Sequence, residues 1–208
     1  MTEKPKAKTP KCKWCGEWVD KEQEFEKASA GYYHPQCHQL FELNKLHKKE
    51  LDDYIIKKHN LENEDLLNKR VLACLVEIGE QCNENQSFKY WKQNKNIERA
   101  KVAEELVDVL HFLLSIGNLL NITVDDNVNA HIERAAQTGD VDYQYITLMN
   151  LISNIALFHR TEYKIHNWKF ALSTFIGLYQ MLGFGTGFIE AEYDKKHEEN
   201  YARQERNY

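Results

Sequence analysis

The stretches VLACLVEIGEQCNEN (residues 71–85) and AEELVDVLHFLLSIG (residues 103–117) carry most of the information about how this chain folds. In each stretch, a run of apolar residues predicts a largely buried α-helix. Each also holds two acidic residues that are three positions apart, Glu77 with Glu80 and Glu105 with Asp108. Residues at this spacing share one face of a helix, so each predicted helix presents two carboxylates on the same side.

The negative charge of the acidic pairs must be neutralised because the pairs lie among apolar side chains. A buried carboxylate costs several kcal/mol, roughly, unless its charge is neutralised. Two such helices packed face to face would place four carboxylates around one point, and oxygen ligands of this kind suit Mg²⁺ or Mn²⁺. The alternative is a pair of exposed acidic stripes that bind nothing, and the spacing alone does not distinguish the two.

Length and composition predict a soluble, mainly helical protein. The chain has 208 residues, of which 42% are hydrophobic and 28% are charged. Its net charge of −5 argues against a general binder of nucleic acid or of acidic lipid. Proline is absent beyond residue 40, which favours an all-α body. No apolar run reaches the roughly 18 residues of a membrane span. We expect residues 1–10 to form a flexible basic tail rather than a signal peptide, and the protein to be cytoplasmic.

Residues 11–38 form a separate unit with the ligand spacing of a structural zinc site. Cys12 and Cys15 are followed by His34 and Cys37, with His38 as a reserve ligand. Two ligands on a tight turn and two more on a second turn are typical of a small treble-clef-like zinc knuckle. A redox or disulfide role is the alternative. The basic and aromatic residues of the unit leave a nucleic-acid or protein partner open.

The two remaining cysteines predict no disulfide. Cys74 and Cys82 are eight residues apart in one helical pattern, which is too far for a bond between them. A reducing compartment is the simpler interpretation.

Residues 39–208 predict a series of helices with a loop at about residues 86–97. The expected helices lie at about residues 39–58, 65–85, 98–121, 125–137, 141–159, 166–182 and 188–206. Wide apolar faces between residues 141 and 182 are able to supply a dimer interface. The architecture expected from these patterns is an all-α helical bundle.

The last predicted helix carries polar side chains suited to an anion. Lys196, Asn200 and Arg203 follow one another at spacings of four and three, so they share one face. A guanidinium is especially apt for phosphate oxygens. Lys89 and Trp91, in the loop after the first acidic helix, add charge and an aromatic wall. Acids for a metal and bases for phosphates together predict a nucleotide site.

Three segments resemble one protein family. Residues 71–92, 103–117 and 193–208 are similar to the dimeric all-α dUTPases, relatives of the MazG-type nucleotide pyrophosphohydrolases. The resemblance spans residues 40–208, and the unit at residues 11–38 lies outside it. It implies a homodimeric helical bundle that hydrolyses dUTP to dUMP and pyrophosphate, with Mg²⁺ in the active site. The family places the attack on the β-phosphorus.

The resemblance also implies roles for individual residues. The metal ligands fall on Glu77, Glu80, Glu105 and Asp108, and one of the first pair, preferably Glu80, activates the attacking water. The motif that closes over the phosphates and the nucleoside corresponds to Lys196, Asn200, Arg203 and Tyr208. The residues near the base or sugar correspond to Asn83, Trp91 and His111. His111 is equally consistent with a histidine of the hydrophobic core.

The chain departs from the family pattern at the position that helps to read uracil. The family usually has Gln three residues before a pair such as Leu51-Asp52, and this chain has Lys48 there. Lysine lacks the donor-plus-acceptor edge of an amide. Two alternatives therefore stay open: the same chemistry on another nucleotide such as dCTP or dUDP, and a zinc-knuckle interaction module with a regulatory helical body.

Overall fold

The computed structural model describes residues 26–28, 31–33, 49–122, 135–184 and 186–206. Two short strands, β1 (Glu26–Ala28) and β2 (Gly31–Tyr33), pair in the antiparallel sense. The helices are α2 (Glu50–Lys58), α3 (Leu67–Asn85), α4 (Arg99–Leu119), α6 (Val141–Leu157), α7 (Thr161–Met181) and α8 (Thr186–Glu205). The prediction of an all-α bundle is confirmed for the body of the chain.

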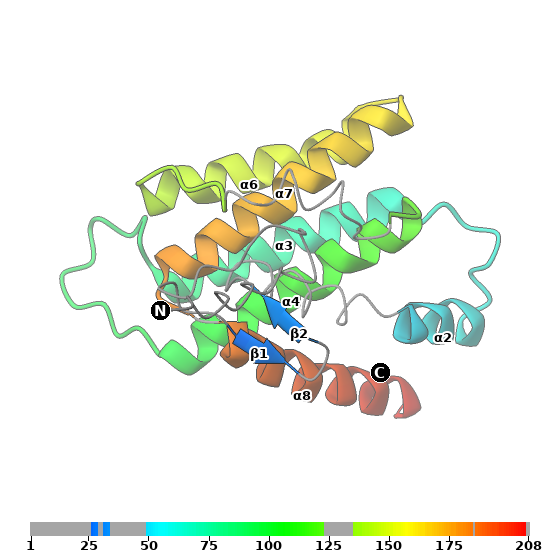
Figure 1. Ribbon diagram of the computed structural model, residues 1–208, viewed down its shortest axis with the longest axis horizontal. Coiled ribbons are helices and arrows are strands. Elements are labelled where there is room, and N and C mark those ends of the chain that lie inside the picture. The colour runs from blue at the N-terminus through cyan, green and yellow to red at the C-terminus, as the bar shows by residue number, and fades with distance from the viewer. Residues whose placement is uncertain (1–25, 29–30, 34–48, 123–134, 185, 207–208) are drawn as a thin grey trace, which may run out of the picture.

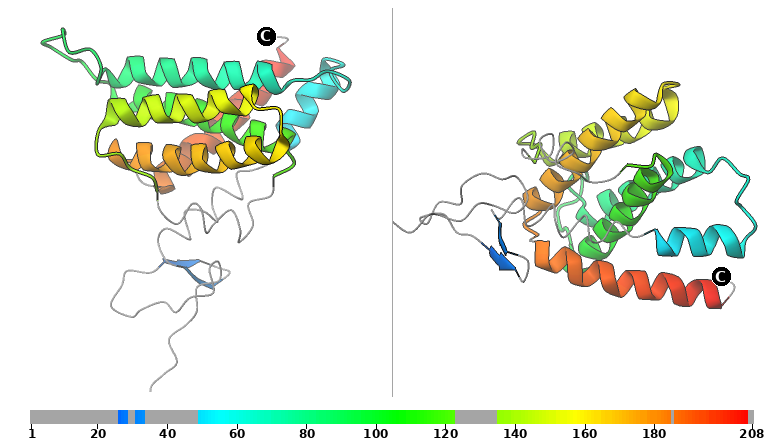
Figure 2. Two further views of the ribbon diagram at one scale, coloured as in Figure 1. Left: turned by 90° about the horizontal axis from the view of Figure 1, so that it is seen from above. Right: turned by 45° about the vertical axis from the view of Figure 1, so that its right-hand side comes forward.

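Four helices form the core of this bundle. Helices α3 and α4 make one helical hairpin, α6 and α7 make a second, and the two hairpins pack against each other through α3 with α6 and α4 with α7 (Figures 1 and 2). Helix α8 packs on α4, and α2 packs on α8 (Figure 1). Helix α4 therefore contacts three neighbours and is the centre of the structure.

Large apolar side chains from α4 and α7 fill much of the space between the hairpins. Leu106, Leu110 and Leu113 of α4 are fully buried, as are Trp168 and Phe175 of α7. The indole Nε1 of Trp168 donates a hydrogen bond to the carbonyl oxygen of Leu113 at 2.7 Å, which satisfies a buried donor. Much of the apolar surface predicted between residues 141 and 182 is thus buried within the chain.

Three boundaries differ by more than two residues from the sequence prediction. Helix α2 begins at Glu50, within the helix predicted over residues 39–58, because Lys49 is its N-cap. Helix α7 begins at Thr161, five residues earlier than expected, after an extended Arg160 and with Glu162 in its first turn. An acidic residue there is favourable because it lies at the positive end of the helix dipole. Residues 135–138 are not helical, although a helix was predicted to reach residue 137. The backbone of Ala136 is instead bonded to Ser173 and Gln144. Residues 123–134 lie outside the described part.

The start of α8 is fixed by the junction between α4 and α7. Gly183 adopts a positive φ of 75° after α7, a conformation that glycine tolerates well. Arg99, the first residue of α4, donates to the carbonyl oxygen of Gly183 at 2.5 Å, and its guanidinium lies 4.3 Å from the ring centre of Phe184. The turn that leads into α8 is therefore held against α4.

Helix α2 is held by a partly buried aspartate. The carboxylate of Asp52 accepts hydrogen bonds from Arg70 Nη1 at 3.0 Å, Ser115 Oγ at 2.8 Å and Asn118 Nδ2 at 3.0 Å. These donors lie on α3 and α4, so a single side chain joins three helices. Charge-assisted hydrogen bonds of this kind are stronger than neutral ones.

The described residues agree with two expectations about chemistry and membranes. Cys74 and Cys82 are both free thiols, which confirms that they form no disulfide. Across the helices that the structure describes, none is sufficiently long and apolar to cross a lipid bilayer.

Close packing at Gly117 gives a test of the core. A Cβ atom added at Gly117 would lie 2.6 Å from Cζ2 of Trp168. We expect Gly117→Ala to destabilise the fold by about 2–3 kcal/mol, because the rigid, buried indole has little room to move. Thermal unfolding followed by circular dichroism should show a Tm lower by roughly 5–10 °C. Gly79→Ala is the matched control, because its Cβ meets no atom within 4 Å and alanine favours helix. Equal Tm values for the two variants would contradict this packing.

Candidate active site

Three carboxylates from two helices converge at one point. Glu77 and Glu80 of α3 and Glu105 of α4 each offer an oxygen atom, and these atoms all lie within 4.8 Å of one another. Behind them, Ile78 of α3 and Leu106 of α4 are fully buried. The apolar residues that anchor the two helices therefore also set the distance between the acids.

Burial and the crowding of negative charges change the protonation of Glu77. Burial raises the pKa of this carboxyl to about 7, and repulsion from Asp108, Glu80 and Glu105 adds to the effect. Burial and Asp108 likewise raise the pKa of Glu105. A cation at this point would relieve the repulsion, so the electrostatics fit a site for a positive ion.

Asp108 completes the acidic face but pairs with a lysine. Its Oδ2 atom lies 2.7 Å from Nζ of Lys196 on α8, and the same ammonium lies 2.9 Å from Oε1 of Glu104. The side chains of Lys196 and Asp108 are 12% and 16% exposed, whereas that of Glu104 is 53% exposed. Burial raises the pKa of Asp108 although Lys196 opposes the shift. Lys196 thus sits beside the acids as a positive charge of the chain itself.

A cavity of about 480 Å³ is lined by residues of α2, α3, α4 and α8. The three converging carboxylates and Asp108 line one side. Lys196, Asn200 and Arg203 line the opposite side, so the polar face predicted for the last helix does face the acids. Leu51 and Ile55 of α2 form an apolar end. The cavity therefore has an acidic wall, a basic wall and an apolar end.

His111 belongs both to the core and to the cavity wall. Its ring stacks on Tyr193 of α8 with ring centres 4.0 Å apart. Burial lowers the pKa of His111 to about 3, with further lowering by His197 and Lys196, so the ring is neutral at physiological pH. Its Nε2 atom is buried without a hydrogen-bond partner among the described residues. His111 is therefore a packed ring of the core that also borders the cavity.

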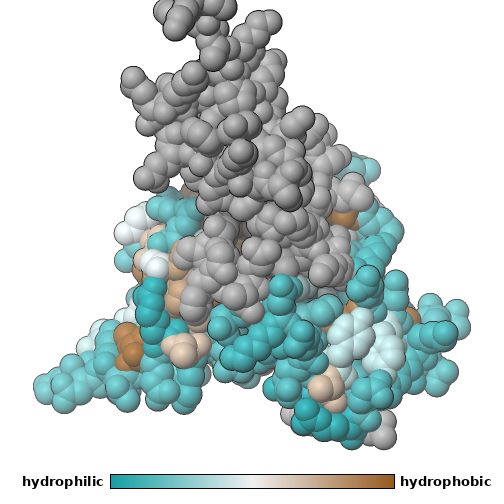
Figure 3. Space-filling view, turned by 60° about the horizontal axis from the view of Figure 1, so that its bottom comes forward, coloured by the Kyte–Doolittle hydropathy of each residue, from teal (hydrophilic) through white to brown (hydrophobic). Residues whose placement is uncertain are grey.

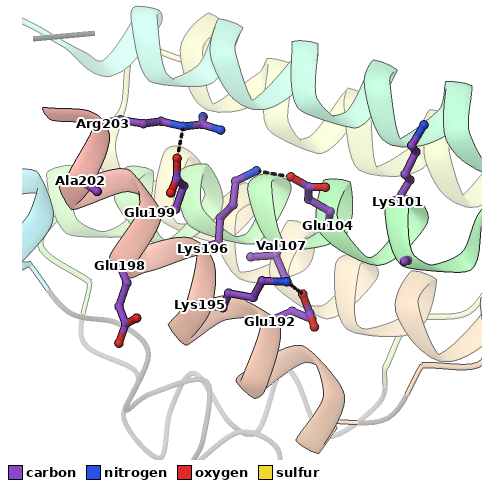
Figure 4. A pocket seen from close by; sticks show the side chains of 11 residues that line it. Lys101, Glu104, Val107, Glu192, Lys195, Lys196, Glu198, Glu199, Ala202 and Arg203 are labelled. Carbon is purple, nitrogen blue, oxygen red and sulfur yellow. Dashed lines mark hydrogen bonds and ion pairs between the residues drawn. The ribbon is translucent and has the colours of Figure 1, made fainter. Parts of the chain in front are cut away.

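A second and larger cavity of about 840 Å³ adjoins the first between α4 and α8 (Figure 4). Glu104, Lys196 and Arg203 line both cavities. The second cavity adds Lys101 and Lys195, which pair with glutamates three residues earlier in the chain. The described surface on the side of α8 is mainly hydrophilic, with scattered apolar residues (Figure 3).

Several residues predicted from the sequence do not line the first cavity. Asn83 is exposed on α3, and its carbonyl oxygen accepts a hydrogen bond from Lys89 at 3.0 Å. Trp91 is exposed in the loop after α3, where its ring contacts Tyr90. The remaining predicted site residues lie outside the part of the chain that the structure describes: Cys12, Cys15, His34, Cys37, Lys48 and Tyr208.

Other cavity residues were not singled out from the sequence. Phe112 and Ser115 lie on the same face of α4 as Asp108, at spacings of four and seven, which is a signal that helical periodicity offers. Asp52 and Gln204 also line the cavity. Their positions depend on how α2 and α8 pack, which no local pattern indicates.

The site and the fold together define a class of protein. A helical bundle in which clustered acids face basic residues across one cavity is suited to binding a divalent cation together with an anionic substrate. A model of the dUTPase family matches residues 38–208, and the chain belongs to this family. No curated protein and no solved structure matches the chain. The resemblance seen in the three sequence segments is thereby confirmed, and membership indicates an enzyme that hydrolyses dUTP or a related nucleotide.

The raised pKa of Glu77 predicts how the metal-free protein responds to pH. The folded protein binds a proton at Glu77 up to about pH 7, whereas the ordinary value for the group is 4.5. The contribution of this group to stability is therefore full below about pH 4.5 and is lost as the pH rises through about 7. With a chelator present, we expect Glu77→Gln to have a Tm a few degrees above that of the unmodified protein at pH 8. At pH 4 the two Tm values should agree, and a variant that is less stable at pH 8 would contradict the proposed crowding.

Proposed function

We propose that this protein hydrolyses dUTP to dUMP and pyrophosphate in a reaction that depends on Mg²⁺, for which Mn²⁺ can substitute. The observation that carries the proposal is the cavity in which Glu77, Glu80 and Glu105 face Lys196 and Arg203. The acids suit a hard divalent cation, and the bases suit phosphate oxygens. Membership of the dUTPase family supports the choice of substrate class.

The residues present fit a divalent cation. Glu77, Glu80 and Glu105 offer carboxylate oxygens at one point, and Asp108 lies next to them on α4. We assign these four residues as the ligands. A bound Mg²⁺ would neutralise charge on the phosphates and lower the pKa of a water molecule.

The side chains around the ligands have distinct tasks in this proposal. Glu80, an exposed member of the acidic group, orients the attacking water and accepts its proton. Lys196 and Arg203 bind phosphate oxygens and stabilise the charge that develops on them. Asn200 lies one turn after Lys196 and supplies an amide for the same group or for the sugar. The electron pair of the broken phosphoanhydride bond stays on the leaving phosphate oxygen.

The apolar end of the cavity accepts the nucleoside. Leu51 and Ile55 line it from α2 and Phe112 lines it from α4, which suits the faces of a base and a sugar. The neutral ring of His111 also borders the cavity. A volume of about 480 Å³ lies within the range of small-molecule sites.

A second candidate function is the same hydrolysis on another nucleotide, such as dCTP or dUDP. The observation that favours it is the state of Asp52, whose carboxylate already accepts three hydrogen bonds from Arg70, Ser115 and Asn118. This side chain therefore has little capacity left to read a base. Lys48, in place of the family's Gln, leaves the recognition of uracil to other groups.

We also propose the organisation of the whole chain. Residues 39–208 form the catalytic domain, residues 11–38 form a zinc-binding unit with a structural role or a partner of its own, and residues 1–10 form a tail. The catalytic domain forms a homodimer. Apolar side chains that stay exposed on α3 and α6, among them Leu72, Val76 and Ile146, support an interface on this side of the bundle.

Removal of one carboxylate tests the chemistry. Glu80→Gln should lower kcat by at least about a thousandfold, because it removes both a metal ligand and the base for the water. The measurement is Mg²⁺-dependent release of pyrophosphate from dUTP, with circular dichroism to show that the helices persist. Glu84→Gln, one turn further along α3 and outside the cavity, should stay within about twofold of the unmodified protein. Substantial activity in Glu80→Gln would refute the assignment.

A nucleotide panel tests the substrate. We expect kcat/KM for dUTP to exceed the values for dCTP and dTTP by about tenfold or more, because the cavity must distinguish bases by a few polar contacts. The assay measures pyrophosphate or phosphate release from dUTP, dUDP, dCTP and dTTP with Mg²⁺ present. Equal turnover of dCTP or dTTP would favour the second candidate function instead.

A further inference from the structure

Lys196 is shared between two carboxylates that differ in their surroundings. Asp108 lines only the cavity that holds the acidic group, whereas Glu104 lies on the wall between the two cavities. Lys196 extends from α8 toward α4 and meets Glu104 there (Figure 4). The ammonium lies at ion-pair distance from both carboxylates, 2.7 Å from Asp108 and 2.9 Å from Glu104, so the two share it.

The lysine and a divalent cation compete for the same oxygen atoms. Lys196 holds Asp108 at ion-pair distance, next to Glu77, Glu80 and Glu105. A cation bound by these acids and by Asp108 repels the ammonium, and the repulsion is strong because the side chains of Lys196 and Asp108 are largely screened from water. Lys196 must then release Asp108, and its only other carboxylate partner in the described part of the chain is Glu104.

We propose that Glu104 is a positioning residue of the active site, which holds Lys196 at the edge of the cavity when a divalent cation takes Asp108. The inference rests on the function proposed above, and it adds a residue that the acidic pairs of the sequence did not include. With Glu104 present, Lys196 exchanges one partner for the other without leaving the site. The ammonium is thus kept where the phosphates arrive, and metal binding costs less than the loss of a whole ion pair.

This arrangement makes a specific prediction for metal binding without nucleotide. In Glu104→Gln, Asp108 is the one remaining carboxylate partner of Lys196 among the described residues. A cation that binds Asp108 must then break this ion pair without a replacement, so we expect Mn²⁺ affinity to fall about fivefold. In Lys196→Met the competitor is gone, so Mn²⁺ should bind at least about as tightly as in the unmodified protein. In the double variant, Glu104→Gln should have no further effect, because Glu104 acts through Lys196.

The experiment is a double-mutant cycle on the full chain. Mn²⁺ binding to the nucleotide-free protein is measured by electron paramagnetic resonance of the free ion, for the unmodified protein, both single variants and the double variant. Glu98→Gln is the matched control: it also removes a charge from the start of α4, but it frees only Lys101, with which Glu98 pairs at 3.6 Å. It should leave Mn²⁺ affinity within about twofold.

Turnover adds a second measurement that a merely structural role would not affect. Glu104→Gln should raise KM for dUTP about fivefold at saturating Mg²⁺ with kcat within about twofold, because the ammonium is less well placed to bind the phosphates. Glu104→Asp, which keeps a carboxylate, should restore part of the loss. Circular dichroism should show the same Tm for both Glu104 variants as for the unmodified protein, because the side chain of Glu104 is half exposed.

The outcomes separate this inference from the function on which it rests. A Glu104→Gln effect that vanishes in the Lys196→Met background supports it. An equal effect in both backgrounds overturns the inference, because Glu104 would then act only through its own charge. The absence of any effect of Glu104→Gln also overturns it. If Mn²⁺ binding is also unaffected by Glu77→Gln, the proposed metal site itself fails. If Glu77→Gln abolishes binding while the cycle is additive, only the role of Glu104 fails.

Discussion

Repulsion between carboxylates held close together is the constraint on which this site depends. Glu77, Glu80 and Glu105 approach within 4.8 Å of one another, and burial with mutual repulsion raises the pKa of Glu77 to about 7. The apolar residues of α3 and α4 provide the energy that holds the acids together against this repulsion. An acidic cluster that packing maintains at a cost is more consistent with cation binding than with surface solubility.

The outer helices α2 and α8 neutralise part of this negative charge and complete the wall of the cavity. Lys196 brings a positive charge from α8 into the acidic group, and Asp52 fastens α2 to α3 and α4. At the other end, Tyr201 of α8 contacts the ring of Tyr54 on α2 with centres 5.5 Å apart. Helices α2 and α8 therefore form one wall of the cavity, supported by the polar contacts of Asp52 at one end and by an aromatic contact at the other. The family match over residues 38–208 agrees with a site that needs all of these helices.

Much of the fold was predictable because it depends on local patterns. The apolar runs around Glu77 and Asp108 predicted α3 and α4 to within two residues, since burial of one helix face determines their extent. The start of α7 and the end of the predicted helix at residue 137 were wrong. The non-helical segment at residues 135–138 depends on bonds of Ala136 to Ser173 and Gln144, which no helical periodicity indicates.

The sequence by itself determined which chemical groups are present and on which helix faces they lie, because a spacing of three or four residues is a local property of the helix. It thus indicated the acids of α3 and α4 and the bases of α8. Only the tertiary structure decided that Lys196 contacts Asp108 and Glu104, that Asp52 is occupied by three donors, and that Lys89 and Trp91 lie away from this cavity. These facts follow from how whole helices pack, and packing depends on the sum of many distant contacts.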